Sequence, residues 1–508
     1  MNWGFEKITG LFSIENSQLL LDGLYGVERE AQRTAPSGDL ATTPHPAAFG
    51  NKLENTLITT DFSESQIELV TPPFETVEKT YAFLKELHLL VDKELGSEYL
   101  WPFSMPPRLP EEERIPIAKF DDSSEGREKE LYRNGLATRY GRKMQMISGI
   151  HYNFSFGDSL VDYLYQSLGN GMDKRAFADD MYFSMARNFL RYRWLLIYLF
   201  GASPCADQTY YPVIGNEMKM VRKCCPECCS PRNNDKQNAV SLRVSRFGYS
   251  DSVQGKYSVS YNSLKEYTAG IRRLLATKSR KFTRLGLYQN GRQTQMNGNI
   301  LQKESEFYSS IRLKQNLKKG ETQLDALENR GVKYAEVRII DLNPFDKTGI
   351  SLEQLRFLQV FMLFCLFEES PPIEGQELEK INKNHHLVAL LGRKNKLKLF
   401  GYGSGQAGLT EWSRDIFNKL SFIASLIDPL NIDNRYQKCV RKEYEKTTDL
   451  SLLPSSMIER EISRYGEGYL EFGIRKAIEH RKPENAVTHF YYAVCPNELN
   501  NKARGLLK

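Results

Sequence analysis

Five short segments of the chain alternate between apolar and polar residues. They are YGVERE, SQIELVTP, HYNFSF, SLRVS and KYAEVRII, which begin at residues 25, 65, 151, 241 and 333. Successive side chains of a β-strand point to opposite faces, so a period of two predicts strands with one apolar and one polar face. An amphipathic sheet with one solvated face is the ordinary explanation of such a pattern.

The polar positions of these segments point beyond simple solvation. They carry carboxylates, an imidazole, an amide and two arginines, with almost no lysine. Glu28 and Glu30 share a face at a separation of ~6.6 Å, so their charges repel unless a cation lies between them. Oxygen ligands suit Mg²⁺ or Mn²⁺, and arginine suits phosphate. The pattern predicts a metal and phosphate site in the hollow of a cupped, mainly antiparallel sheet.

Helical spacing of apolar residues marks five other segments. Helices are expected at 78–95, 179–200, 352–368, 411–427 and 456–480, the last weakened at Gly466 and Gly468. Together with the strands they predict an α+β fold whose helices pack on the outer, apolar face of the sheet. Residues 203–238 are rich in Cys, Pro, Asn and Lys and predict a loop. We expect a catalytic domain at 1–430, which contains this loop, and a mostly helical C-terminal extension at 431–508.

Composition and charge narrow the classes of function. Of 508 residues, 69 are basic and 63 acidic, and the net charge of +6 is spread along the chain. This balance suits anionic small substrates, whereas nucleic-acid binding usually shows a concentrated basic patch. The N-terminus has no signal pattern, and the apolar run 194–200 is far shorter than the ~20 residues that span a bilayer. We therefore expect a cytoplasmic protein without nucleic-acid or membrane partners.

Six longer motifs resemble those of one family. They are YGVERE, ITTDFSESQIELVTP, LWPFSMPP, YRNGLATRYGRKMQMISGIHYNFS, SLRVSRFGY and KYAEVRIIDLNPFDKTGI, in this order. Over roughly residues 20–430 the chain resembles bacterial glutamate–cysteine ligase, also called γ-glutamylcysteine synthetase. The resemblance implies a catalytic barrel like that of glutamine synthetase. It also implies an ATP-dependent reaction in which the γ-carboxyl of L-glutamate, activated as γ-glutamyl phosphate, is joined to the amine of L-cysteine, the first step of glutathione synthesis.

The same resemblance implies a role for each residue that matches a family motif. The metal-binding positions are Glu28, Glu30, Asp61, Glu68, His151 and Glu336. Arg338 and Arg133 match residues that neutralise the transferring phosphate. The positions that bind glutamate in the family match Gln145, Asn153 and Arg243. Those that form the cysteine pocket match Phe62, Tyr132, Leu136, Tyr249 and Tyr308. Phosphoryl transfer requires charge neutralisation and positioning more than a protein nucleophile, which agrees with this set.

The cofactors and partners expected from this family are small. Mg²⁺, or Mn²⁺ in its place, is the expected metal, and ATP the expected co-substrate. L-Glutamate and L-cysteine are the other substrates, and we expect a monomer. The chain leaves no room after the matched region for a second ATP-dependent domain. We therefore expect the reaction to stop at γ-glutamylcysteine.

Four cysteines, Cys224, Cys225, Cys228 and Cys229, form the motif CCPECC. Two overlapping C-x-x-C pairs could hold zinc, but a structural zinc site usually has a second ligand pair farther along, and the sequence offers none. A surface thiol cluster, with redox sensing as its functional form, is the other interpretation.

Two other functions stay open at this point. One is a different carboxylate–amine ligase of the same superfamily. The metal and phosphate residues would be the same, so the residues of the acceptor pocket would distinguish the two enzymes. The other is a zinc or nucleic-acid binding protein built on CCPECC, for which the acidic strand faces would have no role.

Overall fold

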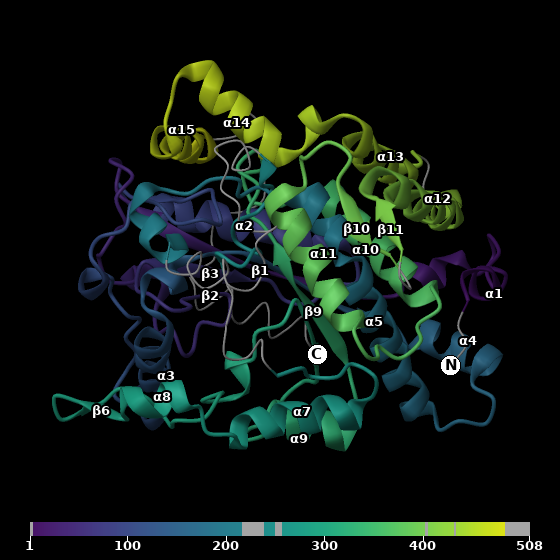
Figure 1. Cartoon of the computed structure of the whole chain (residues 1–508), viewed down its shortest axis with the longest axis horizontal. Coiled ribbons are helices and arrows are strands. Elements are labelled where there is room, and N and C mark those ends of the chain that lie inside the picture. The colour runs from purple at the N-terminus through teal and green to yellow at the C-terminus, as the bar shows by residue number, and fades with distance from the viewer. Residues whose placement is uncertain (1–3, 216–237, 249–256, 402–404, 431–432, 483–508) are drawn as a thin grey trace.

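An antiparallel sheet lies at the centre of the chain (Figure 1). The structure is a computed structural model and describes residues 4–215, 238–248, 257–401, 405–430 and 433–482. Within these residues, six strands form the sheet in the order β2-β3-β1-β5-β9-β8, and a seventh, β4, pairs with β1. The strands are β1 (Gly23–Thr34), β2 (Ile58–Thr59), β3 (Gln66–Val70), β4 (Tyr99–Leu100), β5 (Ile150–Phe156), β8 (Ile311–Lys314) and β9 (Tyr334–Ile340). Every pairing in this sheet is antiparallel.

The register of the sheet brings the polar positions of different strands side by side. Glu28 on β1 lies opposite His151 on β5, and Asn153 lies opposite Glu336 on β9. On the other side of β1, Glu30 lies opposite Glu68 of β3. Four of the five predicted strands are therefore confirmed, and their polar residues share one face.

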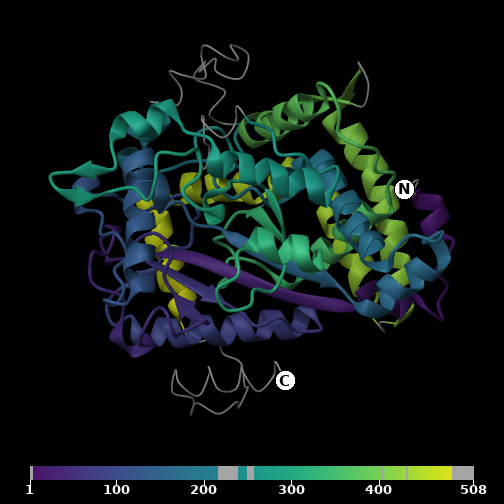
Figure 2. The ribbon, with the colours of Figure 1, turned by 90° about the horizontal axis from the view of Figure 1, so that it is seen from below.

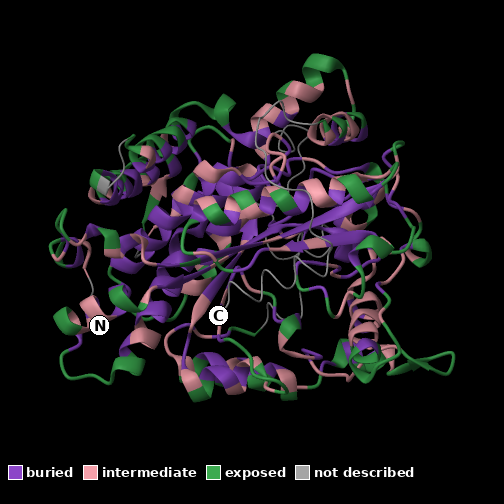
Figure 3. Cartoon of the chain, turned by 180° about the vertical axis from the view of Figure 1, so that it is seen from behind, coloured by how far each residue is buried: buried purple, intermediate pink, exposed green. Residues whose placement is uncertain are grey.

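The opposite, apolar face of the sheet is covered by long helices. α2 (Val77–Glu94) packs on β1 and β3, and α5 (Lys174–Phe200) packs on β9 and β8. α10 (Leu352–Phe367) contacts both helices. Figure 2 shows α2 lying along the long strand β1, and Figure 3 shows the strands and central helices as the most continuously buried part. α5 is buried around most of its circumference, as expected for a helix in the middle of a large core.

The predicted helices are confirmed with small changes of their ends. α2, α5, α10 and α12 (Leu409–Ile427) cover the first four segments. The fifth is two helices, α14 (Pro454–Tyr465) and α15 (Tyr469–Arg481). They separate at Gly466, which has a φ of 63° and closes α14 in the left-handed conformation that glycine adopts without strain.

The remaining helices and two small hairpins surround this core. The helices are α1 (Phe5–Thr9), α3 (Ser124–Tyr140), α4 (Asp158–Leu168), α7 (Leu264–Ala276), α8 (Arg280–Leu285), α9 (Gln323–Arg330), α11 (Glu377–Leu391) and α13 (Arg435–Thr448). The hairpins pair β6 (Tyr288–Gln289) with β7 (Arg292–Gln293) and β10 (Lys398–Phe400) with β11 (Gln406–Gly408). None of the helices in the described part of the chain has the length and apolar character that a membrane crossing requires.

The strand predicted at 241–245 is wrong. These residues form a buried turn, joined to the rest of the fold by a bridge between Ser203 and Ser241. Ser241 Oγ accepts a hydrogen bond from Val244 N, and Ser245 Oγ donates to Leu242 O. Serine side chains that bond to nearby backbone offer the chain an alternative to a sheet ladder, although the alternation of residues is that of a strand.

Two other expectations are not settled by the fold. The sheet has β2 and β8 at its ends, and no closed sheet occurs among the described residues, so the cupped barrel stays a prediction. Residues 203–215 include a short 3₁₀ helix at Gln208–Tyr210, whereas the CCPECC motif lies outside the described residues.

The helices beyond residue 430 pack against the earlier part of the chain. α13 contacts α10 and α12, and α15 contacts β4. At the second contact, Gly473 of α15 faces the indole of Trp101, which is fully buried. A Cβ atom built on Gly473 would lie 2.1 Å from Trp101 Cη2, so no side chain fits there without movement.

We expect Gly473→Ala to destabilise the protein. Alanine favours a helix by about 1 kcal/mol, whereas overpacking a core costs about 1–3 kcal/mol. A contact of 2.1 Å with the fully buried Trp101 places this cost at the upper end, so a net loss of about 2 kcal/mol is expected. The thermal midpoint should fall by at least about 2 °C. Ile478→Ala, at an exposed site of the same helix, is the control and should change the midpoint much less. An unchanged midpoint for Gly473→Ala would mean that α15 is not docked as the structure shows.

Candidate active site

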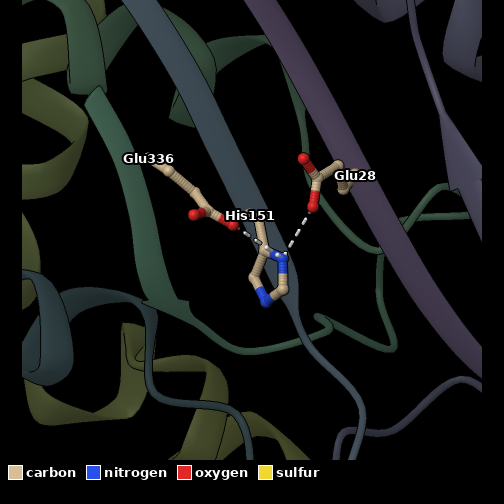
Figure 4. A group of neighbouring side chains, drawn as sticks. All are labelled: Glu28, His151 and Glu336. Carbon is tan, nitrogen blue, oxygen red and sulfur yellow. Dashed lines mark hydrogen bonds and ion pairs between the residues drawn. The ribbon is translucent and has the colours of Figure 1, made fainter. Parts of the chain in front are cut away.

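Three side chains from neighbouring strands meet on the polar face of the sheet (Figure 4). Glu28 comes from β1, His151 from β5 and Glu336 from β9. His151 Nδ1 lies 2.9 Å from Glu28 Oε2 and 3.6 Å from Glu336 Oε1. One ligand atom from each residue can be chosen so that all three lie within 4.8 Å of one another. Such a group of two carboxylates and an imidazole can hold a metal ion.

An irregularity in the β5–β9 pairing shapes this group. Ile150 pairs with Ile340 but Tyr152 pairs with Val337, so β9 has one extra residue opposite His151. Bulges of this kind bend a strand and redirect a side chain, and they are frequent beside active sites. Arg338, one of the two residues of the bulge, turns its guanidinium to the same polar face as His151.

The charges of the three side chains depend on their mutual contacts. Burial would raise the pKa of Glu28, but the hydrogen bond to His151 and the charges of His151 and Lys314 together lower it. Burial would also raise the pKa of Glu336, but Arg338 and Lys314 hold it well below the usual value. Burial and the charge of Arg338 lower the pKa of His151, so its ring stays neutral at pH 7. The group thus offers two anionic carboxylates and a neutral imidazole, the forms in which these residues bind metals.

The other predicted metal ligands extend the group into an acidic cluster. Glu30 Oε1 lies 3.7 Å from His151 Nε2, and Glu30 Oε2 accepts a hydrogen bond from Gly149 N. Burial, followed by the charge of Asp61, raises the pKa of Glu30 to about 8. Burial and the charges of Glu28, Asp61 and Glu30 raise the pKa of Glu68 well above its usual value.

These raised pKa values indicate more negative charge than the protein itself neutralises. Carboxylates this close cannot all ionise unless a cation joins them. A divalent cation with oxygen ligands would restore their ionised forms, so the donor set fits Mg²⁺ or Mn²⁺.

Arg338 and Lys314 bring positive charge to the same face. Arg338 Nη1 donates to Glu336 Oε1 at 2.5 Å and lies 3.4 Å from His151 Nδ1. Burial would lower the pKa of Arg338, but Glu336 and Glu30 raise it, so the guanidinium stays charged. Lys314 Nζ lies 3.3 Å from Glu336 Oε2.

Sequence reasoning did not identify Lys314. The signal was present, because Ile311 and Leu313 are apolar and alternate with Arg312 and Lys314. This four-residue strand is shorter than the segments whose alternation was recognised. Its position beside Glu336 is a consequence of the β8–β9 pairing.

Arg133 lies near the acidic cluster but does not contact the three central side chains. It is on α3, where Nε donates to the carbonyl of Asp61 and Nη2 to that of Thr60. Its guanidinium stacks on the ring of Phe120, with 4.7 Å between Cζ and the ring centroid. Burial lowers the pKa of Arg133, and its charge partly opposes the rise in the pKa of Glu68.

Two of the three residues assigned to glutamate lie at the site. Asn153 Nδ2 donates to Glu28 Oε1 at 2.9 Å, and Arg243 Nη2 donates to the carbonyl of Arg338 at 2.9 Å. Arg243 crosses so close to Gly149 that a Cβ atom there would lie 1.9 Å from its Nη2. Gln145 is buried on the 3₁₀ helix Lys143–Met146. Arg243 therefore reaches the sheet from the buried turn, although the predicted strand is absent.

The residues assigned to cysteine come from α3 and the loops beside it. Phe62 and Leu136 pack in one apolar cluster, and Tyr132 is one helical turn from Leu136. Tyr308 lies in the loop before β8, where burial raises its pKa and the charges of Arg243 and Arg338 oppose that rise. Tyr249 lies outside the described residues.

Carboxylates, an imidazole and arginines gather on one face of the sheet. These are the groups of an enzyme equipped for phosphoryl transfer, and they define the class of this protein.

Comparisons with known proteins identify its family. The chain matches the family described as glutamate-cysteine ligase over residues 8–388. It is 54% identical over 479 residues to glutamate–cysteine ligase of Clostridium acetobutylicum, with 94% of this chain and 100% of that protein covered. It is 36% identical to the same enzyme of Alcanivorax borkumensis, over 94% of this chain and 90% of the relative.

Solved structures agree with this identification. Glutamate–cysteine ligase of Francisella tularensis, in complex with AMP, has a TM-score of 0.82 and 31% identity over 95% of this chain and 93% of that one. A bifunctional glutathione synthetase from Pasteurella multocida has a TM-score of 0.72 and 30% identity, over 92% of this chain and 53% of that one. The chain belongs to the glutamate–cysteine ligase family.

The predicted family and ligase activity are therefore confirmed. The alternative of a zinc or nucleic-acid binding protein without enzymatic activity is wrong, because the match extends over nearly the whole chain. The roles of individual site residues stay predictions that the geometry above makes specific.

Proposed function

We propose that the polar sheet face carries out ATP-dependent formation of γ-glutamylcysteine through γ-glutamyl phosphate. In the first step an oxygen of the glutamate γ-carboxylate attacks the γ-phosphorus of ATP, and ADP leaves. In the second step the amine of cysteine attacks the acyl carbon and phosphate leaves. The observation that supports this most directly is the meeting of Glu28, His151 and Glu336 beside Arg338 in a chain of this family.

Glu28, His151 and Glu336 would hold a divalent cation, with Glu30, Glu68 and Asp61 beside them. Bound there, Mg²⁺ or Mn²⁺ would neutralise and orient the phosphate oxygens of ATP. Asn153 donates to Glu28 and Arg338 donates to Glu336, so both carboxylates are fixed in orientation. Partners of this kind normally position metal ligands and strengthen binding.

Arg338 and Lys314 would neutralise the negative charge that develops on the transferring phosphoryl group. Both side chains are anchored through Glu336 and remain partly accessible. Preorganised positive charge of this kind needs no rearrangement during the reaction. Arg133 would act from the opposite side, through α3, next to Asp61.

Arg243, Asn153 and Gln145 would bind glutamate, and Phe62, Tyr132, Leu136, Tyr249 and Tyr308 would bind cysteine. Arg243 supports this assignment because its Nε and Nη1 have no hydrogen-bond partner among the described residues, although the side chain is buried. Its charge is partly balanced by Asp341, whose Oδ1 lies 3.7 Å from Nη1. A substrate carboxylate would satisfy a buried guanidinium in this situation.

A coupled assay tests the proposed reaction. Phosphate release from ATP is measured with glutamate alone and with glutamate plus cysteine, and the product is identified by mass. We expect release to depend on both amino acids and to match γ-glutamylcysteine formed. α-Aminobutyrate, which replaces the thiol by a methyl group, shows whether the acceptor pocket requires sulfur. A different amine that supports faster release than cysteine would identify another carboxylate–amine ligase instead.

The broader organisation is proposed on the same basis. Residues 1–430 would form the catalytic domain, in the barrel-like form of the glutamine synthetase superfamily, and residues 431–508 its C-terminal extension. The protein would act as a monomer in the cytoplasm. Truncation at residue 430 and analytical ultracentrifugation would test these two proposals.

A further inference from the structure

A buried carboxylate, that of Asp341, lies against the guanidinium of Arg243. Asp341 is the first residue after β9, its side chain is 1% exposed, and its Oδ1 lies 3.7 Å from Arg243 Nη1. The other oxygen, Oδ2, accepts a hydrogen bond of 2.9 Å from Ala202 N, in the segment that follows α5. Asp341 therefore joins the end of β9, the end of α5 and the turn that carries Arg243.

The contact between Asp341 and Arg243 is an ion pair without a direct hydrogen bond. A separation of 3.7 Å is too long for such a bond but keeps the opposite charges close. Arg243 Nε, Arg243 Nη1 and Asp341 Oδ1 are accordingly buried without a hydrogen-bond partner among the described residues. Burial raises the pKa of Asp341, and the charge of Arg243 is the main influence that opposes this rise. Asp341 thus balances the charge of Arg243 and leaves two of its nitrogens available to a substrate.

Two points of one segment hold the guanidinium of Arg243. Its Nη2 donates to the carbonyl of Arg338 at 2.9 Å, and its Nη1 faces Asp341, three residues further along the chain. The charge of Arg243 also opposes the rise in the pKa of Glu30, so it already acts on the acidic cluster. Without Asp341, that cluster would attract the guanidinium with no opposing carboxylate on this segment.

The turn that carries the arginine is also held by α11. Val240 N and Ser241 N both donate to the carbonyl of Ala389, at 2.9 and 3.1 Å. His385 Nε2 lies 2.6 Å from the carbonyl of Val244, which can only accept, so Nε2 carries the proton of this ring. Burial lowers the pKa of His385 well below its usual value, which keeps the ring neutral. The turn is therefore fixed on both sides of the arginine.

We propose that Asp341 positions Arg243 for the α-carboxylate of glutamate, with His385 supporting the turn that carries it. This role rests on the proposed function, which assigns Arg243 to glutamate. The γ-carboxylate has to lie at the metal and the phosphoryl group to be activated, so the α-carboxylate is the one that remains for Arg243. Asp341 touches no substrate in this arrangement. It acts through Arg243, because it preorganises a planar fork that binds two carboxylate oxygens.

Asp341→Asn should raise the KM for glutamate by about tenfold or more, because a small misplacement of a binding group can cost up to ~10²-fold. Asparagine keeps the size of the side chain and an oxygen for Ala202 N, and removes the charge. Turnover and the KM for ATP should change much less, as expected when ground-state binding of one substrate is lost. The KM values, turnover and thermal midpoint are measured together.

Asp428→Asn is the matched control. Asp428 is also 1% exposed, and its two oxygens accept hydrogen bonds from the backbone nitrogens of Tyr436 and Gln437, at the start of α13. This variant should lower the thermal midpoint without changing the KM for glutamate. A near-normal KM for glutamate in Asp341→Asn, or an equal rise in the KM for ATP, would overturn the positioning role.

A competitor separates positioning from general damage. 4-Aminobutyrate keeps the γ-carboxylate and an amine of glutamate but lacks the α-carboxylate. It should compete with glutamate equally well in Asp341→Asn and in the unsubstituted protein. In the double variant with Arg243→Met, Asp341→Asn should raise the KM for glutamate no further, because residues that act through one contact are not additive. A competitor weakened as much as glutamate, or additive effects in the double variant, would contradict the proposal.

The single variants distinguish this role from the proposed function. If Arg243→Met leaves the KM for glutamate unchanged, the assignment of Arg243 to glutamate is wrong and the role of Asp341 falls with it. If Arg243→Met raises that KM and Asp341→Asn does not, the assignment stands and only the positioning role is overturned.

His385→Phe tests the same turn if Asp341→Asn does not fold. Phenylalanine keeps an aromatic ring but removes the donor to the carbonyl of Val244. The KM for glutamate should rise in this variant, and His385→Gln, which keeps a donor, should restore most of the affinity. An unchanged KM in a folded His385→Phe protein would overturn the proposal.

Discussion

Arg338→Lys is expected to lower turnover by roughly two orders of magnitude or more, with little change in thermal midpoint. Lysine keeps the positive charge but loses the planar fork with which arginine addresses two oxygens at once. In the structure Arg338 Nη1 is already engaged with Glu336, so the rest of the guanidinium is available for the phosphoryl group. Removing one preorganised donor from a transition-state site costs about 10²–10³ in turnover.

The competing explanation makes Arg338 only the partner of Glu336 in a structural ion pair. Lysine would then replace it with almost no effect on turnover. Arg330→Lys is the control, because Arg330 pairs with Glu321 in a similar geometry outside the site. Turnover and thermal midpoint are measured for both variants. Near-normal turnover in a folded Arg338→Lys protein would remove this residue from the catalytic set.

Glu28→Gln and Glu30→Gln should each raise the metal concentration required for activity, by about tenfold or more. Loss of residues that only orient a ligand already costs 10–100-fold in metal affinity. Glu28→Gln removes a direct metal ligand that His151 and Asn153 hold in position. Glu30→Gln removes a negative charge from the acidic cluster. Activity is titrated against Mg²⁺ and Mn²⁺ at saturating substrates. Glu75→Gln, at an exposed carboxylate, is the control.

A second measurement on Glu30→Gln needs no substrate. The pKa of Glu30 rises from 4.5 to about 8 in the metal-free fold, so the folded state holds this proton more tightly than the unfolded state. Its contribution to stability is full below pH 4.5 and is lost as the pH rises through about 8. The metal-free variant should therefore lose less stability than the unsubstituted protein between pH 5 and pH 8. Unchanged metal midpoints in both variants, with the same pH dependence, would show that these carboxylates do not bind the cation.

Much of the candidate site could be predicted because its residues lie in regular strands. The alternation in β1, β5 and β9 alone places Glu28, His151 and Glu336 on polar faces. Which strands are neighbours cannot be read from alternation, and only the family resemblance assigned these three residues to one metal site. Alternation wrongly predicted a strand around Arg243. Ser241 and Ser245 form local turn hydrogen bonds there, which an alternating sequence does not reveal.

Helices were predicted with similar success and for a similar reason. Apolar spacing marked α2 and α12, where one face is buried, and two glycines marked the break between α14 and α15. Contacts between distant segments were not predictable. Lys314 reaches Glu336 only after β8 pairs with β9, and Arg243 reaches Asp341 only after the fold is complete.

The alternation that builds the site also constrains how the chain can fold. Polar ligands and core residues occupy successive positions of β1 and β5, so a pairing shifted by one residue would turn Glu28 and Glu30 toward α2 and α5 and send Val27 and Tyr152 into water. Burying these carboxylates among apolar helices would cost several kilocalories per mole, far more than a lost hydrogen bond. The acidic residues therefore select the native strand pairing during folding, before any substrate is bound. Replacing several of them by apolar residues should permit misregistered and aggregation-prone sheets as well as abolishing catalysis.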